Sequence, residues 1–485
     1  MQKLNWYYRR LKAMSADEIA WRVRSSLRDR ADCFVVGRRQ RWRGPSTFLN
    51  GDGRGLGPGF RVCDMTVREA DRRARTDPVV RAPCEALLAR VEKILEHRLS
   101  FFDLTETHLG DPIVWNRDHK RSQDTPMTFC PPLDYRDVET AGDCKFVWEP
   151  NRHHQLVVLS RAYRASGDER FAGGIVEQLD SWLRQNPYGV GMNWRSGPEL
   201  GIRLINWVRA LDLIAESQAI GPELRQRLLD SVSRYIWEID RKYSRGSSAN
   251  NHVIGEAAGV FIAASYFANL KHAATWRQRS WKILNREILN QTYPDGGTRE
   301  QAIGYHLFVV QFFVAAGLVA RATGRDFPES YWSRLEKMFD FLAVLSEGGD
   351  SLPQFGDGDD GYVLDLGSHP RSVGEWLAVG AALFDRADFK ALAGECAEPL
   401  QWLPGASGYR SLAATGAPRE RTIRSQAFAD TKSNCVSTLR STVASVPRSR
   451  IVKSSTLARE SPMSNSTRVL WSSSSMAAKT PSADG

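Results

Sequence analysis

The sequence predicts a mainly α-helical fold in which consecutive helices pair as hairpins. Between residues 148 and 346, apolar residues recur at three- and four-residue spacing in long segments joined by short polar links. Residues 253–267 and 307–319 are apolar around most of a helical circumference, which is typical of helices buried on nearly all sides. The hairpins recur roughly every fifty residues, as in a helical repeat without sequence identity.

The elements can be placed in order along the chain. Helices are predicted over residues 17–30 and 83–97, whereas residues 100–147 carry no clear pattern. The regular part predicts eight helices, over residues 151–166, 170–185, 199–216, 222–240, 250–268, 275–290, 300–323 and 329–346.

Three parts are expected from these patterns. Residues 1–147 form an N-terminal helical and irregular segment, and residues 148–415 form a helical core with a groove. Residues 416–485 are rich in serine and keep neither helical nor strand periodicity. Such a composition cannot bury a core, so we expect disorder there, and it is also the composition expected of a shifted reading frame.

Composition restricts the partners. The chain of 485 residues has a formal net charge of +10, which favours nucleic acid, acidic lipid or acidic polysaccharide, although a generally basic solvated surface would look the same. Zinc-finger spacing and RNA-binding aromatic signatures are absent, so no nucleic-acid partner is expected. No run of eighteen apolar residues occurs, so no membrane span is expected. The oligomeric state is left open.

The cysteines, an aspartate-rich loop and the N-terminal residues bear on whether the chain has metal sites, disulfides or a secretory signal. The seven cysteines are widely spaced without a C-x-x-C pair, so neither a metal site nor a disulfide framework is indicated, and no cofactor is expected. Asp357, Asp359 and Asp360 alternate with glycines, but they lack the EF-hand spacing and predict a plain turn. The first thirty or so residues are Arg-rich without an apolar core segment, unlike a secretory signal.

Four polar clusters stand where the first helix of a hairpin begins, at residues 148–152, 193–199, 247–252 and 295–300. Helix caps and turns account for Ser, Asn, Asp and Gly there, but they do not require Trp, Arg, Glu and His. Equivalent ends of successive hairpins share one rim when the hairpins form a ring or solenoid. The clusters therefore predict a shared groove.

One grouping suits elimination at a uronate. Removing the proton beside a sugar carboxylate builds negative charge on that carboxylate, which Asn and His can neutralise without a metal. Tyr can take the proton when ionised and then return it to the departing oxygen. The candidates are Asn251 and His252 in the third cluster and Tyr305 about one hairpin later.

Five motifs occur in a fixed order along the chain: W-E-P-N-R-H-H, N-W-R-S-G-P-E-L-G-I-R-L-I-N-W, N-N-H-V-I-G-E, D-G-G-T-R-E-Q-A-I-G-Y-H and P-Q-F-G-D-G-D-D-G. With these motifs the chain resembles the heparinase II/III family of polysaccharide lyases, over roughly residues 1–400. The resemblance implies an incomplete (α/α) toroid followed by an antiparallel β-sandwich. It also implies elimination at uronates of heparan sulfate, alginate and related acidic polymers, and a periplasmic or cell-envelope location.

Carried over residue by residue, the resemblance makes Asn251 the carboxylate-neutralising Asn, Tyr305 the catalytic Tyr, and His252 a support for neutralisation or proton transfer. The expected substrate-binding residues are Trp148, Glu149, Asn151, Arg152, Trp194, Arg195, Glu199, Arg203, Asn250, Glu300 and His306. The family also draws a His from its β-sandwich. Here no His follows His369, so the sandwich is expected to be truncated or absent.

Two other functions fit parts of the sequence. A glycoside hydrolase on the same fold would need two carboxylic acids, and Glu149, Glu199 and Glu300 are on the predicted rim. That reaction gives the Asn–His–Tyr grouping no role. A non-catalytic polysaccharide-binding protein of exopolysaccharide synthesis or export would need the groove alone.

Overall fold

The computed structural model describes residues 14–38, 60–61, 63–129, 133–346, 352–358, 360–367, 369–393, 398–403 and 415. The chain divides into two units, Met1–Cys435 and Val436–Gly485, and every described residue belongs to the first. The first unit contains both residues 1–147 and residues 148–415, so the boundary expected between those parts remains a prediction. The expectations for residues 416–485, disorder and a lost β-sandwich, lie outside the described residues.

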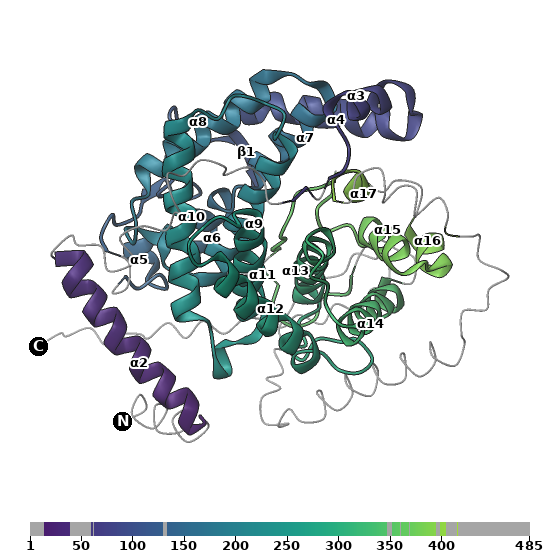
Figure 1. The fold of residues 1–485 in the computed structure, drawn as a ribbon. Helices are drawn as coiled ribbons and strands as arrows, with labels where there is room; N and C mark the ends of the chain where they lie inside the picture. The colour runs from purple at the N-terminus through teal and green to yellow at the C-terminus, as the bar shows by residue number, and fades with distance from the viewer. Residues whose placement is uncertain are drawn as a thin grey trace, which may run out of the picture. The chain divides into compact units, whose positions relative to one another are not determined.

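Helices dominate the described chain (Figure 1). The N-terminal part contains α2 (Ala16–Asp32), the π-helix η1 (Cys33–Arg38), α3 (Val67–Thr76), α4 (Pro78–Leu95), α5 (Val138–Ala141) and α6 (Cys144–Asn151). Between α4 and α5, β1 (Arg98–Phe101) pairs antiparallel with β2 (Leu104–His108), and β3 (Arg117–Asp118) with β4 (Gln123–Asp124). Sequence periodicity did not indicate these short strands.

The eight predicted helices are all present, with ends within about three residues of the expected ones. They are α7 (His154–Ser166), α8 (Glu169–Gln185), α9 (Gly197–Leu213), α10 (Pro222–Lys242), α11 (Asn250–Tyr266), α12 (Ala273–Asn290), α13 (Ile303–Ala322) and α14 (Glu329–Ser346). Shorter elements complete the order: η2 (Met192–Trp194), η3 (Gly246–Ser248), α15 (Val373–Phe384), α16 (Ala387–Ala393) and α17 (Glu398–Trp402).

Alternate helices form an inner row, in which α7 packs on α9, α9 on α11, and α11 on α13. Glycines let α9 and α11 approach closely: a Cβ on Gly201 would lie 2.4 Å from the Gly255 carbonyl oxygen, and one on Gly259 would lie 2.5 Å from Gly201. The intervening helices α8, α10, α12 and α14 keep an exposed face. The mainly α class is confirmed, and paired inner and outer helices are the arrangement of an incomplete (α/α) toroid.

Residues 362–367 connect the inner helices to one another. Asn206 of α9 donates to the Val363 carbonyl at 3.0 Å, and the Val363 amide donates to Gln311 Oε1 of α13 at 2.8 Å. Arg161 of α7 lies 3.4 Å from Asp365, which is fully buried. This non-helical segment therefore fixes the spacing of three inner helices.

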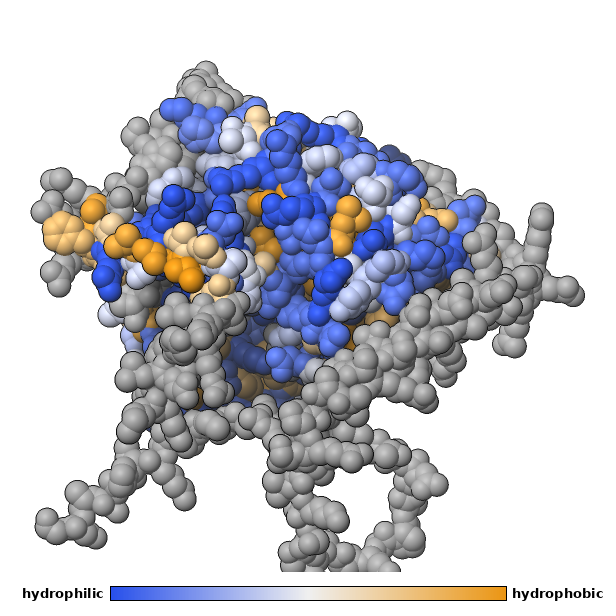
Figure 2. All heavy atoms as spheres, turned by 90° about the horizontal axis from the view of Figure 1, so that it is seen from below, coloured by the Kyte–Doolittle hydropathy of each residue, from blue (hydrophilic) through white to orange (hydrophobic). Residues whose placement is uncertain are grey.

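The longest apolar helix is a core helix. Among the described residues, α13 alone is long and apolar enough to cross a membrane, with a mean hydropathy of 1.9, but 83% of that stretch is buried inside the protein. The face seen in Figure 2 is mainly hydrophilic, and apolar atoms gather at its left edge, on the side where Figure 1 shows α2. Val23 and Leu27 of α2 are exposed, at 53% and 59%.

Candidate active site

The starts of the inner helices are joined pairwise. Arg152, just before α7, binds Glu199 in the first turn of α9. Gly197, at the start of α9, packs against the Glu256 carboxylate of α11, and a Cβ there would lie 2.4 Å from Glu256 Oε1. Asn251, at the start of α11, binds Glu300 just before α13. The first and second polar clusters of the sequence therefore meet, and so do the third and fourth.

Glu300, Asn250 and Asn251 form what we call the amide cluster. Asn251 Nδ2 lies 2.8 Å and 2.9 Å from the two Glu300 carboxylate oxygens, and the Asn251 backbone N–H donates to Oε2 at 3.4 Å. Asn250 Nδ2 donates to Glu300 Oε1 at 3.1 Å. Glu300 is half-buried and Asn251 is 7% exposed. Burial raises the pKa of Glu300 and the charge of Asp357 adds to that effect, while the Asn bonds oppose it.

The other two predicted catalytic residues, His252 and Tyr305, are close to this cluster in sequence. His252 is exposed, and its backbone N–H donates to Asn250 Oδ1 at 3.2 Å. Tyr305 is half-buried in the first turn of α13, with its ring centroid 6.5 Å from that of Phe308. Its neighbour His306 is fully buried, with Nε2 at 3.0 Å from the Met338 carbonyl oxygen, and burial lowers its pKa to about 4.

Glu149, Arg152 and Glu199 form a second group, the arginine cluster. The Arg152 guanidinium donates to Glu199 at 2.8 Å and 2.9 Å and to Glu149 at 2.8 Å. All three side chains are less than a tenth exposed. Burial by itself would raise the pKa of Glu149, but Arg152 and His154 hold it below its ordinary value. His154 in turn stacks on Tyr362, with centroids 4.0 Å apart.

Several expected substrate-binding side chains point into the protein. Arg203 is fully buried, where it donates to the carbonyls of Asn151 and Asn193 and, at 2.8 Å, to Tyr235 Oη. Asn151 is also fully buried and accepts a bond from Trp182 Nε1.

Three further expected residues lie against aromatic rings. Trp194 is 4% exposed and packs on Tyr235 with centroids 4.3 Å apart. Trp148 and Arg195 are half-buried and both lie against Tyr135. In this structure Asn151 and Arg203 have no exposed surface through which to meet a ligand, and Trp194 has very little.

Glu256 is a polar residue of the site region that sequence reasoning gave no role. It is 3% exposed and accepts hydrogen bonds from the Ser244 amide at 2.8 Å and the Ser244 hydroxyl at 2.7 Å. Burial raises the pKa of Glu256 to about 7. The signal was present in the sequence, because Glu256 is the only polar residue between Val253 and Ala264.

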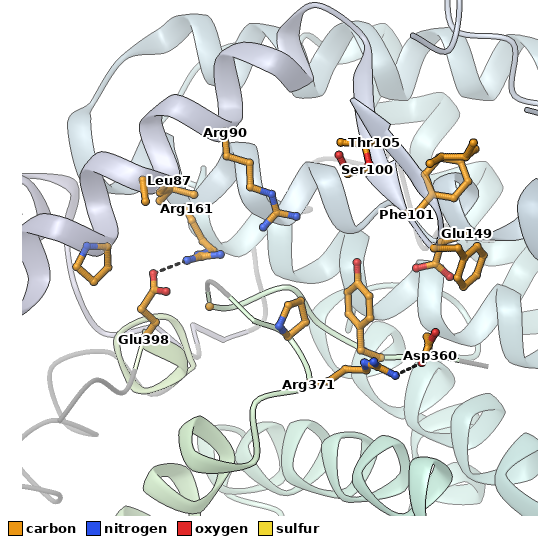
Figure 3. A pocket seen from close by; sticks show the side chains of 17 residues that line it. Leu87, Arg90, Ser100, Phe101, Thr105, Glu149, Arg161, Asp360, Arg371 and Glu398 are labelled. Carbon is orange, nitrogen blue, oxygen red and sulfur yellow. Dashed lines mark hydrogen bonds and ion pairs between the residues drawn. The ribbon is translucent and has the colours of Figure 1, made fainter. Parts of the chain in front are cut away.

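A pocket of about 480 Å³ lies where α4, the β1–β2 hairpin and residues 360–371 meet (Figure 3). Glu149 is the one predicted site residue among its lining groups, and Asn251, His252 and Tyr305 are not among them. Figure 3 shows Arg161 directed at Glu398, 2.8 Å away, and Arg371 at Asp360.

The structure thus brings Asn250, Asn251 and Glu300 together, and separately Glu149, Arg152 and Glu199. Among the residues that the structure describes, no group of three or more His, Cys, Asp and Glu side chains is arranged to hold a metal ion.

Comparison with known proteins gives a family. The model of the heparinase II/III N-terminus matches residues 85–375, more than half of the chain. A heparin-sulfate lyase of Bacteroides stercoris is 30% identical over 237 residues, which are 44% of this chain and 35% of that protein. A heparin-sulfate lyase of Pedobacter heparinus is 28% identical over 239 residues, 48% of this chain and 35% of that protein. The chain thus spans about a third of the length of these curated relatives.

Solved structures are more distant. The heparan sulfate lyase of Pedobacter heparinus is 22% identical with a TM-score of 0.46, covering 67% of this chain and 50% of that one. An alginate lyase from Bacteroides ovatus is 16% identical with a TM-score of 0.46, covering 71% of this chain and 100% of that one. The family model carries the assignment, and by it the chain belongs to the heparinase II/III family.

Proposed function

We propose that this chain is a polysaccharide lyase that cleaves uronate-containing acidic polysaccharide by β-elimination. The observation that carries the proposal is the amide cluster, in which Asn251 and Asn250 hold a carboxylate through neutral donors. A group that binds one carboxylate in this way has the chemistry to bind the carboxylate of a uronate. Membership of the heparinase II/III family supports the same reaction.

The proposed reaction has two proton transfers. Asn251 donates to the substrate carboxylate, supported by His252, and stabilises the negative charge that develops when the C5 proton leaves. Tyr305, as phenolate, takes that proton and passes it to O4 as the C4–O4 bond breaks. The products are a 4,5-unsaturated uronate and a new hydroxyl end, so that atoms and charge balance.

The hydrolase alternative fits less well. Hydrolysis needs one protonated carboxylic acid and a second carboxylate across the scissile bond. Glu149 and Glu199 are buried and both bound to Arg152, and the pKa of Glu149 is lowered despite its burial. A general acid needs the opposite shift, which Glu300 shows, but the Glu300 carboxylate is itself bound by Asn250 and Asn251.

The test uses the conjugated double bond of the product, which absorbs ultraviolet light. Wild-type protein is incubated with heparan sulfate, alginate and other uronate polymers, and absorbance and reducing ends are followed together. Changing Tyr305→Phe keeps the ring and removes the proton carrier, so turnover should fall by about 10²–10⁴-fold without unfolding. Tyr293→Phe, a half-buried Tyr in the segment before α13, is the matched control and should keep its activity.

Two outcomes would replace the proposal. Reducing ends without ultraviolet absorbance would indicate a hydrolase, and Glu149, Glu199 and Glu300 would then be the residues to change. Polymer binding without either signal would indicate a non-catalytic polysaccharide-binding protein.

A further inference from the structure

Among the residues that the structure describes, Glu300 is a carboxylate held by neutral groups alone. Its hydrogen bonds come from the two Asn side chains and from the Asn251 amide. Among the described residues, no Lys, Arg or His forms an ion pair with it. The titratable group whose charge acts on it is another carboxylate, Asp357.

This environment makes the ionised form of Glu300 expensive. Removing a carboxylate from water is offset best by a cation, as Arg152 does for Glu199. At Glu300, burial and Asp357 both favour the proton-bound form, and they raise its pKa. The Glu300 carboxylate lies on the Asn251 amide that the proposed reaction uses. It is bound there more weakly than a buried carboxylate that is paired with an arginine.

We infer that Glu300 is a displaceable internal occupant of the Asn250–Asn251 amides, and that a substrate must bring its own carboxylate to replace it. This inference rests on the proposed function and names the feature that selects the substrate. An incoming carboxylate restores the hydrogen bonds that Glu300 gives up, because one anion takes the place of another. A neutral sugar offers a hydroxyl, which accepts these bonds more weakly, and leaves Glu300 in place.

The exchange is easier when Glu300 takes a proton from solvent, since a neutral carboxyl competes less for the amides. Uronate carboxylates remain ionised well below neutral pH. Affinity for a uronate should therefore rise as the pH is lowered and Glu300 gains its proton, with Asp357 and His252 the other titratable groups of the proposed site.

The test measures binding of glucuronate, with glucose as the neutral probe, by ligand-observed NMR at pH 7. Glu300→Gln keeps the shape and removes the charge, so it should bind glucuronate about 10-fold more tightly than wild type or better. The affinity of this variant for glucuronate should also rise less than that of wild type as the pH is lowered. Glu300→Ala, which empties the position altogether, should show the same direction, and Asn251→Ala should lose glucuronate binding.

The matched control is Glu223→Gln, an exposed carboxylate in the first turn of α10, which should bind like wild type. Thermal unfolding of each variant shows whether it is folded. If Glu300→Gln and Glu300→Ala bind glucuronate no more tightly than wild type, or if no variant binds it, the inference is overturned. Failure of the proposed function looks different: no polymer yields an ultraviolet-absorbing product, while the gain in glucuronate affinity persists.

Discussion

The amide cluster and the arginine cluster both stand at the starts of inner helices, yet they treat carboxylates in opposite ways. In the arginine cluster, the Arg152 guanidinium holds Glu149 and Glu199 by three bonds of 2.8–2.9 Å, and all three side chains are buried. In the amide cluster, a half-buried Glu300 is held by amides without a cation among the described residues.

The difference separates scaffold from ligand site. A buried carboxylate bound to arginine cannot leave without exposing an uncompensated charge, so the arginine cluster fixes α6 and α9 relative to each other. A carboxylate bound to amides can be exchanged for another anion with little change in charge. Polar residues at equivalent helix ends therefore have different roles. They stabilise the scaffold where a cation pairs with the carboxylate, and they can bind a ligand where only amides do.

The largest expected effect tests the arginine cluster as scaffold. Arg152→Ala leaves two buried carboxylates without their cation and should lower the free energy of unfolding by about 3–5 kcal/mol. Denaturant unfolding measures it. Arg170→Ala is the control, because its side chain is 62% exposed and pairs with Glu92 and Asp168; its loss should stay below about 1 kcal/mol. Equal losses in the two variants would remove the distinction between scaffold and surface pairs.

The second prediction concerns the amide cluster as ligand site. Asn251→Ala removes the donor to the developing charge, so kcat/KM on a uronate polymer should fall by about 10²-fold or more. Its effect on the free energy of unfolding should be about 1.5–3 kcal/mol, smaller than that of Arg152→Ala, because a buried amide loses its hydrogen bonds to a carboxylate. Asn290→Ala, at the exposed end of α12, serves as control. If Asn251→Ala lowers the free energy of unfolding but its folded fraction keeps full activity, Asn251 belongs to the scaffold.

The third prediction uses Glu256, the buried carboxylate that connects α11 to Ser244. The pKa of Glu256 is raised from 4.5 to about 7, so between these values the folded protein keeps a proton that the unfolded chain has released. Its contribution to stability is therefore present below about pH 4.5 and is lost as the pH rises through 7, a change on the order of 3 kcal/mol.

Other groups titrate in the same range, and His306, with its pKa lowered to about 4, changes stability in the opposite direction. The contribution of Glu256 is isolated by the difference between wild type and Glu256→Gln. Free energies of unfolding measured at pH 5, 6, 7 and 8 should fall with rising pH more steeply for wild type than for the variant. Parallel curves would mean that Glu256 titrates normally.

The smallest effect is expected at the edge of the amide cluster. Asn250 makes one side-chain bond to Glu300, at 3.1 Å, whereas Asn251 contacts both oxygens. Asn250→Ala should therefore reduce kcat/KM on a uronate polymer by about 2–10-fold, far less than Asn251→Ala. Steady-state kinetics on the same polymer compare the two, and equal losses would show that the pair acts as one unit.

Much of the fold could be predicted from the sequence because helix formation follows local periodicity. The eight helices from α7 to α14 were expected from the apolar spacing, and the four polar clusters at the starts of alternate helices were read directly from the sequence. Of the site, the sequence indicated that Asn251 and Tyr305 stand at the starts of neighbouring inner helices. Their catalytic roles stay predictions.

The side-chain partners were decided by tertiary structure. Glu300 lies 49 residues from Asn251 and Glu199 lies 47 from Arg152, so their pairing depends on how hairpins pack and leaves no periodic signal. Packing also turned Arg203 inward onto backbone carbonyls, although the sequence placed it among the expected substrate-binding residues. The sequence by itself determined where helices and polar ends occur, because those are local properties. Only the tertiary structure decided which polar ends are saturated by a cation, because that requires groups from distant hairpins to meet in space.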